Sequence, residues 1–522
     1  MTTAADMDRV LGDPADLRGL FSHARLAELD RAEEFPADHC RELDRFGLPA
    51  HYVPARFGGD LHSYPELLEL IRAVARRDLT VAVAHAKTFL GSICVWLAGD
   101  DDQAGWLARE VRAGTPVSWA LTERGHGSDL LAGEVTAYDG RLTGEKWLIN
   151  NATRSSLLTV LARTSPAGGP RGFSVVLADK RTLPEGSYRH LPKVPTHGIR
   201  GADISGIEFR DAPSTLVGEP GGGLELVLKA LQLTRTFCAG LSLGAADQAL
   251  RQATAFTRDR HLYGRRLIDM PHVRRTLGEA HAARIVGEAV TTVAARSIHT
   301  LPGEMAVVSA VTKAFVPARI DELIGACGTL LGARAFLTEV LDHGAFQKLD
   351  RDHRVVAIFD GSSFVNQNAL INHFPALVGG YRKGTVDEQG LRRTLDTSLP
   401  LPAADPDQLT LSSRNGSSLV QHLRAGDLPE LPGAAELRQA CEEVHGQLAG
   451  IAPAARDVSP EAFALAQRYE LCFAGAAVLG LHLVNGGDES RATAALAYVL
   501  ARLTGRPAGP AYDRLAEEAV DA

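Results

Sequence analysis

The spacing of apolar side chains changes several times along the 522 residues of this chain. Residues 65–76 (PELLELIRAVAR) place apolar side chains three and four positions apart, which is typical of an amphipathic helix. Ser63 is a candidate N-cap for this helix, and Pro65 suits its first turn. We therefore expect a helical domain over residues 1–115.

Short segments rich in β-branched and aromatic residues replace this pattern after residue 115. They read VSWAL at 117–121, GEVTAY at 133–138 and FSVVL at 173–177. Asp139 and Gly140 follow the second segment, and this pair favours the turn of a two-residue β-hairpin. We expect an antiparallel β domain over residues 116–215, not the alternating strands and helices of a parallel sheet.

Helical periodicity returns at Leu224 and continues to about residue 380, which predicts a helical bundle over residues 216–380. Residues 381–432 are rich in Gly, Pro, Ser and Asp, a composition typical of a linker. An extra helical region, 433–522, follows. Its periodic segments are 434–448, 460–484 and 491–503. The predicted fold class is multidomain α+β, with a β domain between helical domains.

Composition and charge narrow the classes of function. A net charge of -8 without a Lys/Arg run argues against nucleic acid as the main partner. Six scattered cysteines without a CxxC pair favour reduced thiols in a cytoplasmic protein over disulfides or a metal site. The amino terminus lacks the basic and apolar regions of a signal peptide. The apolar segment 471–484 is too short to span a bilayer, so we expect a buried helix there and no membrane span.

Five short motifs contain the candidate chemistry. A loop rich in small residues follows the first predicted strand, where small residues let a backbone approach a ligand and hydroxyls can bind its polar edge. Taken alone, this loop is also compatible with an ordinary glycine-rich turn. The motifs are WALTERGHGSD at 119–129, GEKWLINN at 144–151, RHLYGR at 260–265, LLGARAFL at 330–337 and IFDGSS at 358–363.

In this order and spacing, the motifs resemble the acyl-CoA dehydrogenase flavoprotein family, over residues 40–375. The family reads Tyr-Glu-Gly-Thr where this chain has Phe359, Asp360 and Gly361. The resemblance implies that Asp360 is the base that removes the α proton of an acyl thioester, while the β hydrogen leaves as hydride to the flavin. Asp has a reach shorter than Glu by about 1.5 Å, one carbon–carbon bond. A helix-capping Asp before Gly361 is the structural alternative.

The resemblance also implies a set of binding residues. Trp147 is one position early for the family's aromatic residue, so it is either a flavin neighbour or a core or surface residue. Arg260 and Tyr263 are expected to reach the FAD of a neighbouring subunit, which implies a dimer or tetramer; an ordinary solvated helix end is the alternative for Arg260. The implied FAD contacts are Trp119, Leu121, Thr122, Gly127, Ser128, Asn150, Arg260, Tyr263, Gly332 and Ser362. The implied substrate contacts are Ser128, Arg235, Phe359 and Gly361.

Three functions follow as hypotheses. The favoured one is FAD-dependent dehydrogenation of an acyl-CoA or an acyl-carrier protein to a 2-enoyl thioester, with an electron-transfer flavoprotein or another acceptor. The second is a flavin oxidase similar to nitroalkane oxidases, which use Asp as the base; against it, Gln367 stands where we expect Arg in those enzymes. The third is a catalytically weak flavoprotein or binding scaffold. Residues 433–522 lie outside the resemblance and are a candidate docking or dimerisation element.

Overall fold

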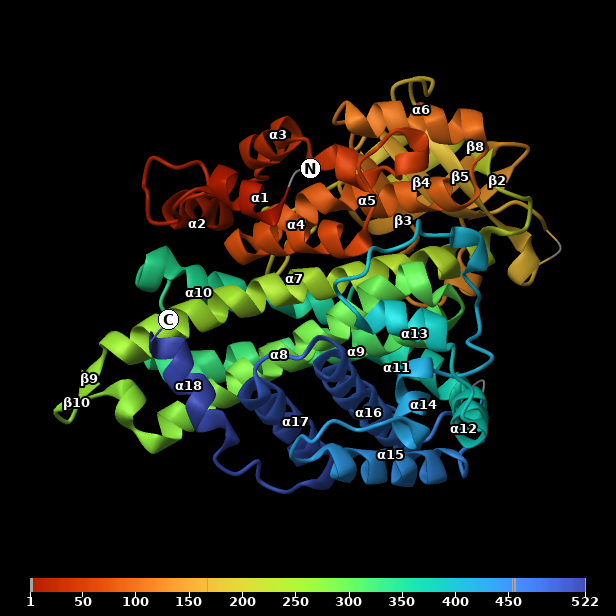
Figure 1. Cartoon of the computed structure of the whole chain (residues 1–522). Helices are drawn as coiled ribbons and strands as arrows, with labels where there is room; N and C mark the ends of the chain where they lie inside the picture. The colour runs from red at the N-terminus through yellow and green to blue at the C-terminus, as the bar shows by residue number, and fades with distance from the viewer. Residues whose placement is uncertain (1–2, 167, 453, 455–456, 522) are drawn as a thin grey trace. The chain divides into compact units, whose positions relative to one another are not determined.

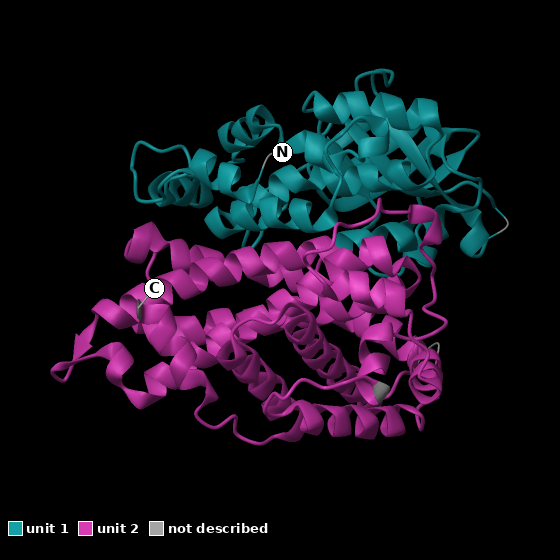
Figure 2. Ribbon diagram, in the orientation of Figure 1, with its two compact units in different colours: residues 1–234 teal, residues 235–522 magenta. Residues whose placement is uncertain are grey.

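The computed structural model describes residues 3–166, 168–452, 454 and 457–521 (Figure 1). The ends of the predicted first and last domains, and a few positions within the last, lie outside this range. The chain divides into two compact units, Met1–Thr234 and Arg235–Ala522, which Figure 2 colours separately.

Helices precede the sheet in the first unit. Ser63 begins one of them, because its side chain accepts a hydrogen bond from the Glu66 backbone N–H at 3.4 Å and Pro65 occupies the first turn. Both features confirm the predicted helix start. The helices are α1 (Ala4–Leu11), α2 (His23–Ala32), α3 (Ala37–Phe46), α4 (Tyr64–Arg77), α5 (Leu79–Ala98) and α6 (Asp101–Arg112).

Helix α5 is apolar enough to be compared with a membrane span. By length and composition alone its 20 residues suffice to cross a bilayer. However, 83% of its most apolar window is buried inside the structure, which is the situation of a core helix. The apolar segment 471–484 is part of helix α16 (Pro460–Asn485), in which half of the residues are buried, whereas Leu483 and Val484 at the end of the segment are exposed.

One sheet contains the strands of the first unit, and it corrects the expected pairing. Most neighbours are antiparallel, but β4 pairs in parallel with β1 and β2, so the sheet is mixed. The chain re-enters beside β1 in the same direction because a long loop and the β2–β3 hairpin come first. Asp139 and Gly140 form that hairpin's turn with φ values of 48° and 73°, as predicted. The strands are β1 (Val117–Ala120), β2 (Thr136–Tyr138), β3 (Arg141–Asn150), β4 (Leu157–Arg163), β5 (Phe173–Asp179), β6 (Tyr188–Leu191), β7 (Ile204–Pro213) and β8 (Thr215–Val217).

Helices dominate the second unit (Figure 1). Helix α7 (Gly223–Asp259) belongs to this unit from Arg235 onward, and α8 and α9 pack along each other. Between α7 and α8 a small hairpin contains β9 (His261–Leu262) and β10 (Arg265–Arg266). The helices after it are α8 (Pro271–Thr300), α9 (Met305–Leu331), α10 (Leu341–His353), α11 (Ser363–Asn372) and α12 (Phe374–Lys383).

The predicted linker, residues 381–432, is not a structureless connection. It contains α13 (Glu388–Leu395) and α14 (Ser418–Ala425), which bury Leu391 and Val420. The Arg296 side chain of α8 donates to the Thr394 carbonyl oxygen at 2.8 Å and ties α13 to the bundle. The Gly and Pro residues that suggested a linker lie mainly in the loops around these short helices.

The extra carboxy-terminal region packs on the bundle. Helices α16, α17 and α18 all contact α8, and α16 also contacts α11. The predicted segments 434–448, 460–484 and 491–503 correspond to the first three of its helices, whereas the last was not anticipated. The helices are α15 (Ala434–Leu448), α16, α17 (Glu489–Thr504) and α18 (Ala511–Asp521).

Candidate active site

Asp360 lies in a strained turn between a 3-10 helix (Arg354–Ala357) and α11. Its φ of 55° and the φ of 89° at Gly361 both fall in the left-handed region. A side chain in this region costs roughly 1–2 kcal/mol, so neighbouring groups must hold the turn. A Cβ on Gly361 would lie 3.2 Å from the Arg235 Nη2 atom and 3.3 Å from the Asn366 Nδ2 atom. Glycine is therefore required next to Asp360 by both conformation and space.

Two buried cations hold the backbone of this turn. The Arg235 Nε donates to the Asp360 carbonyl oxygen at 3.3 Å, which places the predicted substrate residue Arg235 beside the base. The Lys313 Nζ, on α9, donates to the carbonyl oxygens of Val356 at 2.7 Å and Gly361 at 3.1 Å. Desolvation lowers the pKa of Arg235 to about 10 and also lowers the pKa of Lys313, while the negative charge of Asp360 opposes both shifts.

The helix after the turn is capped by Ser362 and not by Asp360. The Ser362 Oγ accepts a hydrogen bond from the Val365 backbone N–H at 3.4 Å. The Asn366 Nδ2 returns to the carbonyl oxygens of Gly361 and Ser362, at 2.9 Å in both cases. The Asp360 carboxylate is therefore not used as a helix cap, and the structural alternative for this residue is excluded.

The Asp360 carboxylate lies beside the thiol of Cys238. The Cys238 Sγ lies 3.9 Å from the Asp360 Oδ2, and burial together with the Asp360 charge raises the pKa of this thiol. The Phe359 ring packs 5.6 Å from the Lys313 Nζ. In the described part of the chain no arginine, lysine or histidine forms an ion pair with the Asp360 carboxylate. Its oxygens therefore remain available to accept a proton.

Lys313 is the functional residue that the sequence did not reveal. Sequence spacing gives no signal for it, because 47 positions separate it from Asp360 and it lies within a long apolar helix. Its side chain is fully buried, which is rare for a lysine without a carboxylate partner. Only the packing of α9 against the turn assigns it to the Asp360 segment.

In the first unit, the start of the predicted flavin loop is fixed to β3. The Thr122 Oγ1 donates to the Trp147 carbonyl oxygen at 2.8 Å, and the Lys146 Nζ donates to the Leu121 carbonyl oxygen at 3.0 Å. Trp119 is buried within β1. Leu121 and Thr122 are half-buried, so their exposed edges remain accessible to a ligand.

An unanticipated ion pair shapes the same loop. The Glu123 carboxylate binds the buried Lys146 Nζ at 2.8 Å and accepts backbone N–H bonds from Glu134 at 2.6 Å and Val135 at 3.2 Å. Burial raises the pKa of Glu123, but the Lys146 charge and these hydrogen bonds outweigh it, and the net shift is downward. The acid of this motif therefore has a structural role, and it closes the base of the loop.

The tip of the loop is open. Gly127 and Ser128 are exposed, and a Cβ on Gly127 would meet no atom within 4 Å. The His126 Nε2 lies 3.5 Å from a Glu134 carboxylate oxygen. The described residues of the first unit therefore leave the predicted ligand-facing residues Gly127 and Ser128 exposed.

A β-bulge decides which side chains share a face near Asn150. Leu148 has a φ of 59°, and the pairing of β3 with β7 shifts between Trp147 and Ile149. As a result Trp147 and Asn150 are both half-buried, whereas Ile149 is buried. Trp147 stacks under the Arg124 guanidinium, 4.5 Å from its ring centroid. Its role beside a flavin remains a prediction.

Asn150 is only partly satisfied by the protein. Its Nδ2 donates one of its two hydrogens to the Val83 carbonyl oxygen at 3.0 Å. Its Oδ1 is buried and has no hydrogen-bond partner among the described residues. An unpartnered buried acceptor fits the N–H edge of a flavin, and the residues of the first unit are in this respect compatible with FAD.

The third and fourth motifs are exposed. Arg260 is exposed, and Tyr263 is 94% exposed at the turn of the β9–β10 hairpin with a φ of 53°. Gly332, with a φ of 62°, ends α9. The two alanines that follow it, Ala333 and Ala335, are in a 3-10 helix (Gly332–Ala335).

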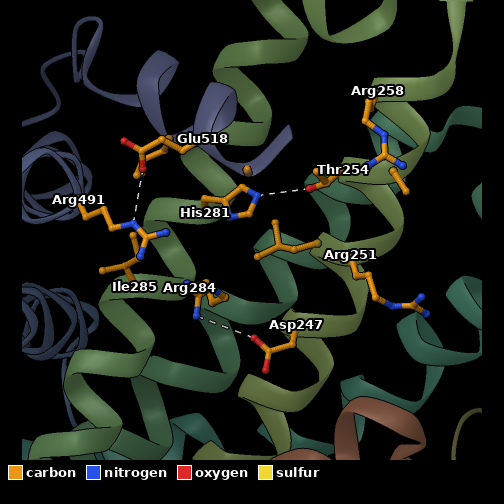
Figure 3. A pocket seen from close by; sticks show the side chains of 13 residues that line it. Asp247, Arg251, Thr254, Arg258, His281, Arg284, Ile285, Arg491 and Glu518 are labelled. Carbon is orange, nitrogen blue, oxygen red and sulfur yellow. Dashed lines mark hydrogen bonds and ion pairs between the residues drawn. The ribbon is translucent and has the colours of Figure 1, made fainter. Parts of the chain in front are cut away.

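A separate pocket of about 500 Å³ lies among α7, α8, α17 and α18, and none of the predicted site residues lines it (Figure 3). Its arginines are largely paired with acids of the chain. Arg491 lies 3.6 Å from a Glu518 oxygen, and Arg284 lies 4.0 Å from an Asp247 oxygen. Because its charge is compensated internally, we assign no ligand to it. Among the described residues no group of three or more His, Cys, Asp or Glu side chains is arranged to hold a metal ion.

Three domain models of one protein family match consecutive segments of this chain. Models of the N-terminal, middle and C-terminal domains of acyl-CoA dehydrogenases match residues 22–113, 118–212 and 221–373. A probable acyl-CoA dehydrogenase of Mycobacterium tuberculosis is 26% identical over 356 residues, covering 65% of this chain and 88% of that protein. Cyclohex-1-ene-1-carbonyl-CoA dehydrogenase of Syntrophus aciditrophicus is 31% identical over 285 residues, covering 51% and 67%.

A solved structure extends the likeness of fold to the carboxy-terminal helices. The crystal structure of an acyl-CoA dehydrogenase from Bacillus anthracis complexed with FAD has a TM-score of 0.74 at 17% identity, covering 99% of this chain and 94% of that one. The extra helical region, which lies outside the matched domain models, therefore has a counterpart in a known fold.

Proposed function

Because this chain belongs to the acyl-CoA dehydrogenase family of FAD-dependent oxidoreductases, we propose that it dehydrogenates an acyl thioester to a 2-enoyl thioester with Asp360 as the base. The main support is the anchoring of this residue. Its backbone is held by Arg235 and Lys313, while its carboxylate forms no ion pair within the described residues. Two buried cations thus hold the backbone of a residue whose carboxylate forms no ion pair among the described residues.

The chemistry requires a base that is fixed in position. The α proton of a thioester is weakly acidic, so its removal needs a well-placed carboxylate in a site that excludes water. The bound FAD supplies the hydride acceptor for the β hydrogen. Asp360 takes the α proton on a carboxylate oxygen, next to the Cys238 side chain.

Asp reaches less far than Glu, so the backbone at Asp360 must place the carboxylate correctly. Misplacement of a reacting group by about 1 Å can cost on the order of 10²-fold in rate. The left-handed turn at Asp360 and Gly361 sets the height of the carboxylate, and Arg235 and Asn366 keep that turn in place. We propose that this turn is adapted to an aspartate.

The partners follow from the same proposal. The substrate is carried by coenzyme A or by a carrier protein, and the electrons pass to an electron-transfer flavoprotein or another acceptor in the cytoplasm. The exposed side chains of Arg260 and Tyr263 support a homo-oligomer, a dimer or tetramer, in which this hairpin meets the FAD of a neighbouring subunit.

A flavin oxidase of the same fold is less well supported. Gln367, seven positions after Asp360, is buried and donates a hydrogen bond to Glu470 at 3.2 Å. It therefore brings no positive charge to the base. A binding scaffold without activity is also less well supported, since a scaffold has no need for a strained and unpaired Asp360.

The test is anaerobic flavin reduction by a panel of acyl-CoA and acyl-carrier thioesters of different chain length. We expect at least one of them to bleach the bound flavin. Asp360→Asn should slow this step by about 10²- to 10⁴-fold, the usual contribution of a general base, while retaining the flavin absorbance. The matched control is Asp350→Asn, which removes an exposed acid paired with Arg354.

Two results would contradict the proposal. Desaturation by Asp360→Asn at the wild-type rate removes the base assignment. Bleaching by nitroalkanes with no response to any thioester favours the oxidase instead.

A further inference from the structure

A fully buried carboxyl group connects the extra carboxy-terminal region to the helix that follows the proposed base. Glu470 lies in α16 and is 4% exposed. Its Oε1 accepts a hydrogen bond from the Nε2 of Gln367, on α11, at 3.2 Å. The neighbouring Asn366 binds the carbonyl oxygens of Gly361 and Ser362. Two adjacent residues of α11 therefore make these contacts. Asn366 binds the base segment, and Gln367 binds Glu470.

We propose that Glu470 is a positioning residue for Asp360 and acts by holding α11 through Gln367. The inference rests on the proposed role of Asp360 as the base. It also gives the helices after residue 432 a role, because α16 supports α11, the helix that follows the base segment.

The surroundings of Glu470 favour its neutral form. Burial raises the pKa of Glu470 to about 8, and the Gln367 hydrogen bond and the charge of Arg319 on α9 only partly oppose this. Arg319 forms an ion pair with Glu322 at 2.9 Å through its Nη2 atom. Among the described residues, Arg319 is the one charged group with a resolved effect on Glu470.

Ionisation of Glu470 therefore places an unpaired charge inside the second unit. The Gln367 N–H still donates to the ionised carboxylate, but entry of water or movement toward Arg319 should loosen the packing of α16 on α11. We expect the base segment to lose its support as the pH rises through about 8. A proton on Glu470 thus couples the carboxy-terminal region to the base.

The link between Glu470 and stability has a definite sign. The folded-state pKa of about 8 lies above the ordinary value of 4.5, so the folded protein retains a proton that the unfolded chain has lost. The contribution of Glu470 to stability therefore falls as the pH rises from about 4.5 to about 8, and it is constant above that.

The decisive variant is Glu470→Gln, which has the same shape and is neutral at every pH. In the wild type we expect the rate of flavin reduction to fall above about pH 8, and in Glu470→Gln we expect this fall to move upward by at least about one pH unit. Amide hydrogen exchange of the peptide 358–367, corrected for the intrinsic effect of pH, should rise above that pH in the wild type only.

A second variant tests the connection itself. Gln367→Leu removes the hydrogen bond at all pH values, so we expect kcat to fall by about 10-fold near pH 7 with little change in KM. Faster exchange in peptide 358–367 should accompany it. A purely structural contact would lower the melting temperature without this split between kcat and KM.

Glu304→Gln is the matched control. Glu304 is also a buried acid with a raised pKa, about 7, but its carboxylate binds the Ser418 backbone N–H at 2.9 Å and so belongs to the contacts of α14. We expect this variant to keep the wild-type fall in rate at alkaline pH and the wild-type exchange of peptide 358–367.

The proposal is overturned if Glu470→Gln keeps the wild-type pH profile and exchange, or if Glu304→Gln changes them to the same extent. Failure of the proposed function is separable. If Asp360→Asn remains active, the base assignment falls, whereas the exchange measurements still decide whether Glu470 holds the segment, because they need no turnover.

Discussion

The Asp360 segment and the hairpin of residues 260–265 are equally visible as sequence motifs, but they differ in how the second unit holds them. The Asp360 turn is fixed from inside by the buried side chains of Arg235, Lys313 and Asn366. The hairpin instead presents Tyr263 at 94% exposure. The Asp360 turn is held by side chains of its own unit, whereas the hairpin exposes the Tyr263 side chain.

This difference separates two kinds of functional residue. A base must be placed within a fraction of an ångström, so buried hydrogen bonds are needed to fix its position. A residue that contacts a neighbouring subunit's cofactor is ordered by that partner, so it remains exposed in the single chain. The buried anchors of Asp360 predict large effects on rate, and the exposure of Tyr263 predicts effects on cofactor affinity alone.

The largest effect is expected for Lys313→Met. The substitution removes the Lys313 donor from the Val356 carbonyl oxygen, at a cost of roughly 1–3 kcal/mol, and leaves Asn366 as the side-chain donor to the Gly361 carbonyl oxygen, so the turn should shift. We expect flavin reduction to slow by about 10²-fold. Stopped-flow absorbance at 450 nm, roughly the flavin band, measures it.

Thr312→Val is the control for Lys313→Met, because Thr312 is buried on the same helix and bonds only the Val308 carbonyl oxygen, at 2.8 Å, one turn away. It should keep the wild-type rate. Equal slowing by the two variants would mean that α9 packing in general, and not Lys313, supports the base.

An intermediate effect is expected for Gly361→Ala. Its φ of 89° and the 3.2 Å approach to Arg235 Nη2 make a Cβ costly, so we expect about 10-fold slower flavin reduction and a lower melting temperature. Gly384→Ala changes a glycine with a φ of 63° and no atom within 4 Å. It should lower the melting temperature but leave the rate unchanged; a wild-type rate for Gly361→Ala would argue against a role for the turn.

The smallest effect is expected for Tyr263→Ala. Because the side chain is exposed in the single chain, unfolding free energy should change by less than about 0.5 kcal/mol. Fluorescence titration of the apoprotein should nevertheless show weaker FAD binding, by about 10-fold. Leu17→Ala, at another exposed apolar side chain (70%), should leave both quantities unchanged. A lower stability with unaltered FAD binding would show that the hairpin packs within its own chain.

Local signals were sufficient for much of the fold. Ser63 and Pro65 predicted a helix start, and Asp139 with Gly140 predicted a hairpin turn, because capping and turn chemistry act over a few residues. The periodic segments 434–448 and 460–484 were likewise recognised as helices from their own apolar spacing.

Signals that depend on distant neighbours were missed. The sheet is mixed because β4 returns beside β1, which no local pattern specifies. Residues 381–432 contain two short helices, which the composition did not reveal because Gly and Pro residues surround them. Asn150 donates to the Val83 carbonyl oxygen, 67 positions away, a contact that no local pattern predicts.

The order of the motifs along the chain was enough to identify the family and to select Asp360, since motif residues and their spacing are properties of the sequence alone. Tertiary packing decided how Asp360 is held. Lys313 and Arg235 come from helices far apart in the chain, and only folding brings their charges and hydrogen bonds to one turn. A buried charge acquires its meaning from its neighbours in space, and those neighbours are not adjacent in sequence.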